Sequence, residues 1–410
     1  MSTSSSNHDA HYYIDLEASY GAANYLPIPV VLQRGEGVWV WDIDGKKYLD
    51  MMAAYSALSF GYGHPKILEV FKKQAETLAV TSRAYYTNQL GCFLKKACEI
   101  TGMDKALPMN SGAEAVETAI KAARRWGYEV KEIPHNQAEI IVAEHNFHGR
   151  TTTIISFSSE PEYQRGFWPL TPGFKKVPFG DAAAFEAAIT PNTCAFLVEP
   201  IQGEAGIIVP PDGYLKKCET ICRRQNVLLI VDEIQSGLGR TGKNFAVEHE
   251  NVKPDAITLG KALGGGLLPV SLLLGTDELM GVFNPGSHGS TFGGNPLAAA
   301  VGTISLTILE EEKLAERAAR LGDYLFKKLR AIESPLIKMV RGKGLWVGME
   351  IDRRYASART VCERLAINGV LSKETHETVV RFAPPLIIDK EQIDYGVERV
   401  EKTIKELTIL

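Results

Sequence analysis

The sequence predicts an α/β fold in which a mostly parallel sheet, covered by helices, forms a large domain and a smaller α/β domain follows it. The 410 residues are enough for two domains with a substantial core. Short apolar segments alternate with segments of helical spacing. Because these segments are apolar on both faces, they indicate a parallel sheet with helices on either side. The predicted strands are 138–145, 151–158, 193–200, 226–233, 255–260 and 270–275.

Before the sheet domain, the segment 1–55 has its own pattern. Apolar and polar residues alternate around Asp44 and Gly45, which predicts a β-hairpin. We expect this segment to pack with the C-terminal domain. The sheet domain should then occupy 56–301. A helix is expected at 111–129, with Ala115, Ala119, Ala122 and Trp126 on one stripe.

The region 302–410 predicts the smaller domain. A long amphipathic helix is expected over 306–332, with apolar residues at helical spacing from Leu314 to Leu329. Short strands are expected within 338–351 and 378–388.

Composition excludes several classes of protein. A net charge of −4 provides no basic surface for nucleic acid. No apolar segment approaches the roughly 20 residues of a membrane span. The chain has no lysine or arginine before Arg34, which argues against a secretory or mitochondrial leader. We expect the first dozen residues to form a frayed tail.

The six cysteines are too sparse for a disulfide scaffold, and reduced thiols in a cytoplasmic protein are expected. Cys218 and Cys222 share a helix face, but no further ligands stand nearby, so no metal site is predicted.

Polar residues follow two of the predicted strands. Asp232 comes directly after five apolar residues, and Lys261 follows the next strand. Ligands of open α/β sheets bind at the carboxyl ends of strands, so both side chains should meet there. Desolvation should lower the pKa of Lys261 and make its amine a nucleophile able to form a Schiff base.

A third group lies where the helix 111–129 begins. Ser111, Gly112 and Ala113 leave backbone N–H groups free to bind an anion, and Ser290 and Thr291 offer hydroxyls among glycines. Pyridoxal 5'-phosphate requires a lysine, a carboxylate and a phosphate-binding cup, and these three groups are present. N-capping by Asn110 or Ser111 and ion pairing of Asp232 remain open as structural alternatives.

A nucleotide site is the competing interpretation from another class. The segment Gly237–Asn244 matches a glycine-rich phosphate motif, but such motifs need a helix directly after them. The residues that follow are poor helix formers, and Asn244 stands where a magnesium-binding hydroxyl belongs.

Eight motifs, taken together, resemble the class III pyridoxal-phosphate-dependent aminotransferases, nearest to the branch that acts on ornithine. The resemblance extends from about Tyr20 to the C-terminus. The motifs are YGAANYLPIPVVL, NSGAEAVETAIKAAR, VEPIQGEAG, VDEIQSGLGRTG, LGKALGGG, HGSTFGGNPLA, RGKGL and VRFAPPL. The resemblance implies fold type I with a seven-stranded sheet, and a homodimer with shared active sites.

The resemblance also implies roles for individual residues. Lys261 would carry the cofactor and move the proton, and Asp232 would pair with the pyridine nitrogen. The remaining cofactor contacts would come from Ser111, Gly112, Ala113, Phe147, His148, Gln235, and, across the dimer, Ser290 and Thr291. Substrate contacts would come from Tyr20, Tyr55, Arg150, and a gating pair of Glu204 and Arg381.

The implied reaction moves the terminal amine of ornithine to 2-oxoglutarate by a ping-pong mechanism. His148 stands where ornithine enzymes often have tryptophan, and YSALSFGYGHP departs from the usual run; acetylornithine enzymes resemble the histidine version. Acetylornithine and 4-aminobutyrate therefore remain alternative substrates, and a protein without catalytic activity is a further alternative.

Overall fold

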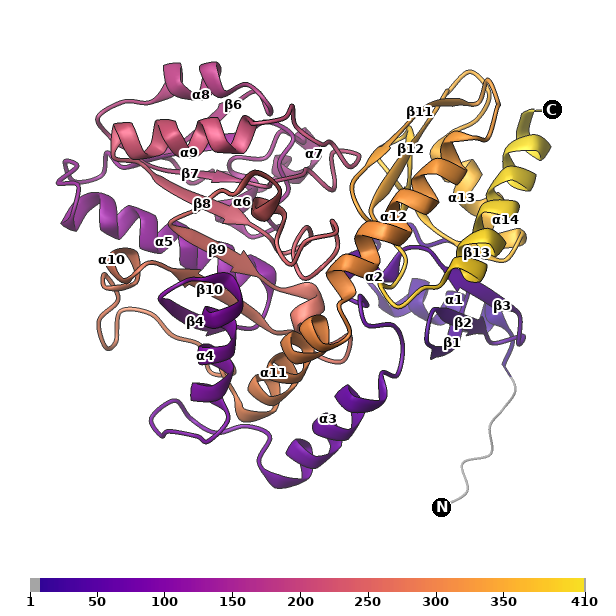
Figure 1. The fold of residues 1–410 in the computed structure, drawn as a ribbon, viewed down its shortest axis with the longest axis horizontal. Coiled ribbons are helices and arrows are strands. Elements are labelled where there is room, and N and C mark those ends of the chain that lie inside the picture. The colour runs from indigo at the N-terminus through magenta and orange to yellow at the C-terminus, as the bar shows by residue number, and fades with distance from the viewer. Residues whose placement is uncertain (1–7, 409–410) are drawn as a thin grey trace.

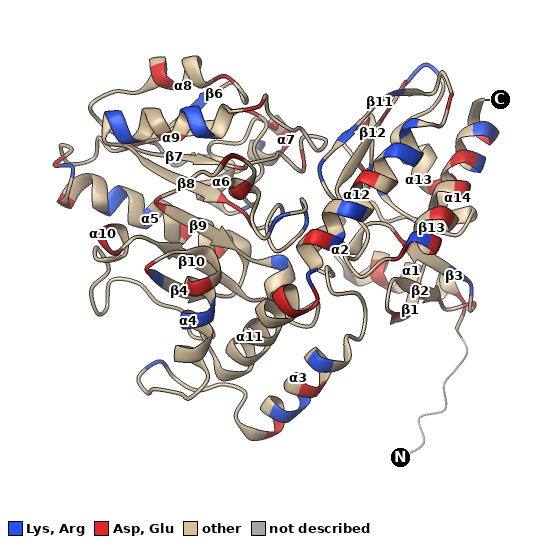
Figure 2. Cartoon of the chain, in the orientation of Figure 1, with Lys and Arg blue, Asp and Glu red and all other residues tan. Residues whose placement is uncertain are grey.

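Residues 8–408 are described by this computed structural model, which has two α/β parts (Figure 1). The larger part contains the central sheet, and helices α11 (Pro296–Glu311) and α12 (Leu314–Arg330) lead from it to the smaller part. The N-terminal strands lie beside the smaller part. Figure 2 shows that the helices carry charged residues of both signs.

The central sheet has seven strands in the order β4-β10-β9-β8-β7-β5-β6. Strand β10 is antiparallel to both of its neighbours, and the remaining pairs are parallel. The mostly parallel seven-stranded sheet is therefore confirmed. The strands are β4 (Lys105–Met109), β5 (Glu139–Ala143), β6 (Phe174–Val177), β7 (Thr193–Val198), β8 (Leu228–Asp232), β9 (Ala256–Leu259) and β10 (Ser271–Gly275).

Both faces of this sheet are buried, and alternate residues of each strand enter different cores. On one face, Ile230 and Leu197 pack with α5 (Gly112–Glu129). On the other face, Leu229 and Val231 join a core that includes residues of α9 (Tyr214–Gln225). The two-residue period of a strand explains why these segments are apolar throughout.

The other elements of the larger part cover the sheet or connect its strands. They are α3 (Pro65–Thr77), α4 (Leu90–Thr101), α6 (Thr152–Ile155), α7 (Pro161–Gln164), α8 (Ala182–Ala188), η1 (Ala246–Glu250), η2 (Lys261–Gly264) and α10 (Asp277–Met280).

Two four-stranded sheets form the smaller part and its N-terminal neighbour, in the orders β1-β2-β3-β13 and β11-β12-β15-β14. The predicted hairpin is present, since β2 pairs with β3, and β3 also pairs in parallel with β13 from the C-terminal region. This pairing supports the division into 1–55, 56–301 and 302–410 that we propose. The elements are α1 (Ala10–Tyr20), β1 (Leu32–Glu36), β2 (Trp39–Asp42), β3 (Lys47–Asp50), α2 (Ala53–Ser56), β11 (Ile337–Gly342), β12 (Val347–Ile351), α13 (Ala358–Ile367), β13 (Val370–Leu371), β14 (Lys373–Thr375), β15 (Val379–Phe382) and α14 (Lys390–Thr408).

The strand predicted at 151–158 is wrong, because this segment contains the short helix α6. The hydroxyl of Thr151 accepts a hydrogen bond from the backbone of Ile154 and caps the helix. Ile154 and Ile155 are buried in the helix as they would be in a strand. Strands β4 and β6 were missed because a proline lies in β4 and two lysines lie in β6.

The single helix predicted at 306–332 is two helices. Lys313 has a φ of 48° and breaks the chain between α11 and α12. The predicted apolar stripe from Leu314 to Leu329 is buried in α12.

The predicted tail is also partly wrong. Residues 1–7 lie outside the described residues, but Ala10 already begins α1, and the carboxylate of Asp9 caps that helix by accepting from Tyr12. None of the helices formed by residues 8–408 has both the length and the apolar character needed to cross a membrane.

Candidate active site

A cavity of about 180 Å³ opens at the carboxyl ends of β7 and β8. It collects most of the residues that the sequence predicted for the cofactor. The lining residues are Gly112, Ala113, Phe147, His148, Glu199, Ile201, Asp232, Ile234, Gln235, Ser236 and Lys261.

Asp232 is the last residue of β8 and is 5% exposed at the cavity. Its Oδ2 lies 2.6 Å from Nδ1 of His148, and its Oδ1 accepts from the backbone of Ile234 at 3.0 Å. Burial opposes a charge on His148, but the hydrogen bond and the charge of Asp232 outweigh it and raise the histidine pKa. The carboxylate of Asp232 therefore favours the charged form of the histidine behind it.

Glu199 follows β7 just as Asp232 ends β8. Its carboxylate accepts from the backbone of Phe147 at 2.9 Å and of Gly203 at 3.4 Å. Burial raises the pKa of Glu199 to about 7 despite the nearby charge of His148. Glu199 was not predicted from the sequence, although it shows the signal that identified Asp232, a carboxylate directly after an apolar strand.

Lys261 follows β9 and Gly260, and has a φ of 45°. Desolvation lowers its pKa to about 8. Among residues 8–408, none forms a hydrogen bond or ion pair with its amine. The amine is consequently available for covalent chemistry near neutral pH.

The N-terminus of α5 lies at another wall of the cavity. Ser111 caps this helix through its hydroxyl, and Glu114 completes a capping box by accepting from Ser111 and Asn110. A Cβ atom at Gly112 would lie 3.0 Å from Ile234, so a larger residue would crowd this wall. The predicted N-cap and the predicted anion site therefore coincide at one helix end.

A second group of charges comes from the smaller part. Arg381 of β15 is 1% exposed, and its Nη2 lies 2.9 Å from Oε1 of Glu204. The amide of Gln235 contacts both, accepting from Arg381 at 3.0 Å and donating to Glu204 at 3.3 Å. Burial alone would raise the pKa of Glu204, but the positive charges of Arg381 and Lys261 lower it. The pair is thus ionised beside the lysine.

Aromatic rings lie beside two of the predicted substrate-binding arginines. The guanidinium of Arg381 lies 5.4 Å from the ring of Tyr55. Arg150 is exposed, with its guanidinium 3.9 Å from the ring of Tyr163 and 5.9 Å from that of Phe147. Tyr163 had no sequence signal, because it lies in the short helix α7 after the segment that was mistaken for a strand.

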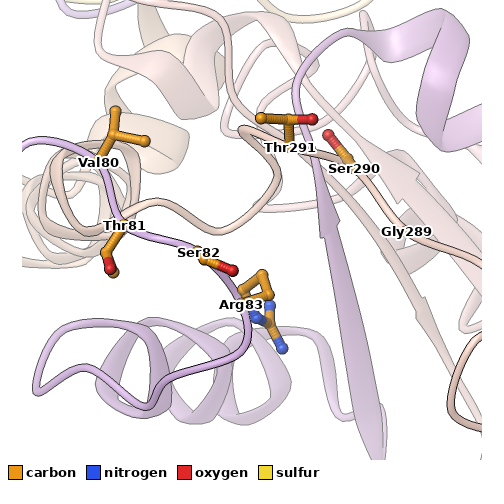
Figure 3. Close-up of a pocket in the computed structure, with 7 residues that line it drawn as sticks. All are labelled: Val80, Thr81, Ser82, Arg83, Gly289, Ser290 and Thr291. Atoms are coloured by element: carbon orange, nitrogen blue, oxygen red, sulfur yellow. The ribbon is translucent and has the colours of Figure 1, made fainter.

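Three predicted residues lie away from this cavity. Ser290 and Thr291 line an open cavity of about 540 Å³ together with residues 80–83 (Figure 3). The hydroxyl of Ser290 accepts from the side-chain amide of Asn110 at 2.9 Å, next to the start of α5. Tyr20, at the end of α1, is 87% exposed.

The competing nucleotide motif does not form a phosphate loop. The segment Gly237–Asn244 consists of turns and bends, and the 3-10 helix η1 follows it in place of an α-helix. Its Arg240 is fully buried and donates to backbone carbonyls.

A family model described as "Aminotransferase class-III" matches residues 20–404. The chain belongs to the class III aminotransferases. Ornithine aminotransferase from a Geobacillus strain is 57% identical over 95% of this chain and 97% of its own length. That of Bacillus subtilis is 55% identical over 96% of this chain and 97% of its own length.

Solved structures of the family superpose closely. Ornithine aminotransferase from Toxoplasma gondii has a TM-score of 0.96 and 44% identity, covering 97% of this chain and 96% of that chain. Acetylornithine aminotransferase from Elizabethkingia anophelis has a TM-score of 0.88 and 47% identity, covering 97% of this chain and 100% of that chain. The fold of this family is fold type I.

Pyridoxal phosphate is the cofactor of class III aminotransferases. The residues at the cavity fit this group. Nε2 of His148 is buried and has no hydrogen-bond partner among residues 8–408, as expected beside a cavity that a planar polar group fills. A free amine, a carboxylate with a cationic partner, and an uncrowded helix N-terminus lie around the same space.

Proposed function

We propose that this protein is an ornithine aminotransferase, which moves the terminal amine of ornithine to 2-oxoglutarate through pyridoxal phosphate. The products would be glutamate and glutamate semialdehyde, which cyclises to pyrroline-5-carboxylate. The observation that carries the proposal is the ion pair of Glu204 and Arg381 beside Lys261. Such a pair allows one cavity to accept two substrates of different charge.

Lys261 would bind the cofactor covalently and then move the proton between the two carbon positions that transamination connects. Its lowered pKa, about 8, suits both roles, because the amine must alternate between its protonated and neutral forms. The bound cofactor supplies an electron sink for the reacting carbon.

Asp232 would keep the pyridine nitrogen protonated, and His148 would hold Asp232 in place. The backbone N–H groups of Gly112 and Ala113 would bind the phosphate with the hydroxyl of Ser111. Phe147 would stack on the ring, and Gln235 would contact the ring hydroxyl.

Glu204 and Arg381 would act as a gate. Ornithine presents a terminal amine without an adjacent carboxylate, and a free Arg381 would bind its distant α-carboxylate in the wrong orientation. Paired with Glu204, the arginine is neutralised. Glutamate would displace Glu204 with its own α-carboxylate, so one anion replaces another and the buried arginine is never left unpaired.

The other substrate contacts follow from position. Tyr55 lies beside Arg381, and Arg150 lies at the cavity mouth over Tyr163 and Phe147, where it would bind a substrate carboxylate. Tyr20 would contribute only if α1 approaches a cavity in the assembled protein.

The assembly would be a homodimer in which Ser290 and Thr291 complete the phosphate cup of the partner subunit. Exposed aromatic residues close in sequence to residues 80–83 and 289–291 support this proposal: Tyr86 and Tyr85 are 105% and 71% exposed, and Phe292 is 54% exposed. Monomeric proteins rarely leave such a surface uncovered.

Six free cysteines fit the cytoplasmic location that we also propose.

The gate is tested by measuring the two half-reactions separately in stopped flow. Glu204→Ala should slow the ornithine half-reaction and increase transfer from α-amino acids. Arg381→Ala should disable the glutamate half-reaction and affect the ornithine half less. Arg223→Ala, which breaks the pair of Arg223 with the buried Asp255 outside the cavity, is the matched control and should affect both halves equally. Equal losses in both halves for the two gate variants would mean that the pair is structural.

Acetylornithine is the second candidate amine, since the Elizabethkingia anophelis acetylornithine enzyme shares 47% of its residues with this chain. The ratio of kcat/KM for ornithine and for acetylornithine decides between them.

A further inference from the structure

A turn with an unusual backbone carries Tyr55 to the active site. Residues Ala53 to Ser56 are four consecutive non-glycine residues with φ between 45° and 74°. Side chains clash with the backbone in this left-handed conformation, so the turn must be held by its surroundings. The backbone conformation that places Tyr55 therefore lowers the stability of the fold.

Two side chains hold this turn. The carboxylate of Asp50 accepts from the backbone of Met52 at 2.8 Å and of Ala53 at 2.9 Å, at the start of the turn. The hydroxyl of Ser59 donates to the carbonyl of Ser56 at 3.1 Å, at its end. Ser59 is 0% exposed.

Arg240 extends this network into the rest of the protein. Its side chain is 0% exposed, and its Nη2 donates to the hydroxyl of Ser59 at 3.2 Å. Its Nη1 donates to the carbonyls of Leu345 at 2.9 Å and Pro384 at 2.7 Å. One guanidinium thus connects the turn of Tyr55 with two segments of the smaller part. Burial lowers the pKa of Arg240 to about 9, which leaves it protonated at neutral pH.

Arg240 and the gate belong to the same local structure. Arg240 lies five residues after Gln235, whose amide contacts Arg381, and Pro384 lies three residues after Arg381. Arg381 is further fixed by the pairing of β15 with β12 and β14. Backbone hydrogen bonds from Ala57 to Ala54 and from Leu58 to Ala53 support the turn from within. Arg240 adds a side-chain connection from Ser59 to the carbonyls of Leu345 and Pro384.

We propose that Arg240 is a positioning residue that acts through Ser59 to hold Tyr55 against Arg381, and so favours the substrate that reacts through its terminal amine. The inference rests on the proposed function. Lysine could not replace Arg240, because a single ammonium lacks the planar fork that reaches three acceptors.

The test compares half-reactions in holoenzyme variants. Ser59→Ala and Arg240→Lys should each lower kcat/KM for ornithine relative to that for glutamate by about tenfold, the change expected for one lost hydrogen bond to a charged group. The double variant should lose less than the product of the two effects, because both changes break one connection.

Arg317→Lys is the matched control. Arg317 also donates to backbone carbonyls, those of Leu386, Ile387 and Ile388, but lines no part of the cavity. Arg317→Lys should lower the melting temperature. It should leave the ratio of the two half-reactions within about twofold of the unchanged protein, because a loss of fold stability affects both half-reactions alike.

Ser59→Ala alone is sufficient to test the proposed positioning role, so the test still applies if Arg240→Lys fails to fold. A ratio within about twofold of the unchanged protein in Ser59→Ala would overturn the inference. The unchanged protein separately tests the proposed function: if another terminal amine reacts in place of ornithine, the ratio is measured with that amine.

Discussion

At the scale of single residues, burial decides which titratable groups are chemically useful. Lys261, Glu199 and His148 all line one small cavity, and each has a pKa displaced from its ordinary value. Desolvation disfavours the charged form of all three groups. Only for His148, beside Asp232, does the pKa still shift toward the charged form. The lowered pKa of Lys261 therefore favours the neutral, nucleophilic form of its amine.

The pKa of Lys261 leads to a prediction on cofactor uptake. Only the neutral amine attacks an aldehyde, so the rate at which cofactor-free protein takes up pyridoxal phosphate should rise with pH through a midpoint near 8. Stopped-flow absorbance across pH values measures this. A midpoint near the usual lysine value, about 10.4, would show that burial does not activate the amine.

Asp232→Asn should keep the shape of the site and lose the charge that protonates the ring. The loss of a charge-assisted hydrogen bond, about 1.5–3 kcal/mol, corresponds to a decrease in turnover of roughly 10- to 150-fold with cofactor still bound. Asp255→Asn, which changes a buried carboxylate paired with Arg223 outside the cavity, is the control for stability. Near-normal turnover in Asp232→Asn would refute the role.

At the scale of elements, the site depends on where strands end and helices begin. Asp232 and Lys261 were predictable because apolar strands precede both. Glu199 could have been found in the same way. The ion pair of Glu204 with Arg381 joins residues 177 positions apart, so no local pattern could predict it, and only the family resemblance suggested it.

At helix α5, the N-capping role of Ser111 can be measured separately from its proposed role in binding the phosphate. Ser111→Ala should cost about 1 kcal/mol of stability through the lost N-cap. It should also weaken cofactor affinity, because Ser111 lies at the proposed phosphate site. Ser357→Ala removes the equivalent cap of α13 outside the cavity and should cost similar stability with no effect on affinity. Equal cofactor affinity in both variants, measured by fluorescence titration, would place the phosphate elsewhere.

The errors in the element predictions share a physical cause. A short apolar run can be buried as a strand or as a helix. At 152–155 the run is helical, and the hydroxyl of Thr151 caps the helix at its N-terminus. Helical periodicity continued across Lys313, although the backbone there is left-handed. Local patterns therefore predicted which residues are buried better than where elements begin and end.

At the scale of the whole molecule, the proposed function includes a homodimer with shared active sites. Ser290 and Thr291 line a cavity with residues 80–83, outside the cofactor cavity of their own chain, and the exposed Tyr85 and Tyr86 follow shortly after these residues in the sequence. The parallel sheet and the smaller α/β part were predictable from alternating patterns. An interface was not, because exposed aromatic residues have no periodic signal in the sequence.

Thr291→Ala tests the shared site. It should weaken cofactor affinity by about 1.5–3 kcal/mol, the value of one hydrogen bond to a charged group, without changing the mass of the assembly. Cofactor titration combined with light scattering measures both. A monomer that binds cofactor with undiminished affinity would contradict the shared site.

The central claim is that Lys261 and the gate serve a ping-pong exchange between ornithine and 2-oxoglutarate. The visible spectrum of the purified protein with pyridoxal phosphate tests it most directly. We predict a visible band that borohydride removes while fixing the cofactor on the peptide of Lys261, that ornithine also removes, and that 2-oxoglutarate then restores. A protein that remains colourless with the cofactor, label on another lysine, or a band that ornithine leaves unchanged would contradict the account.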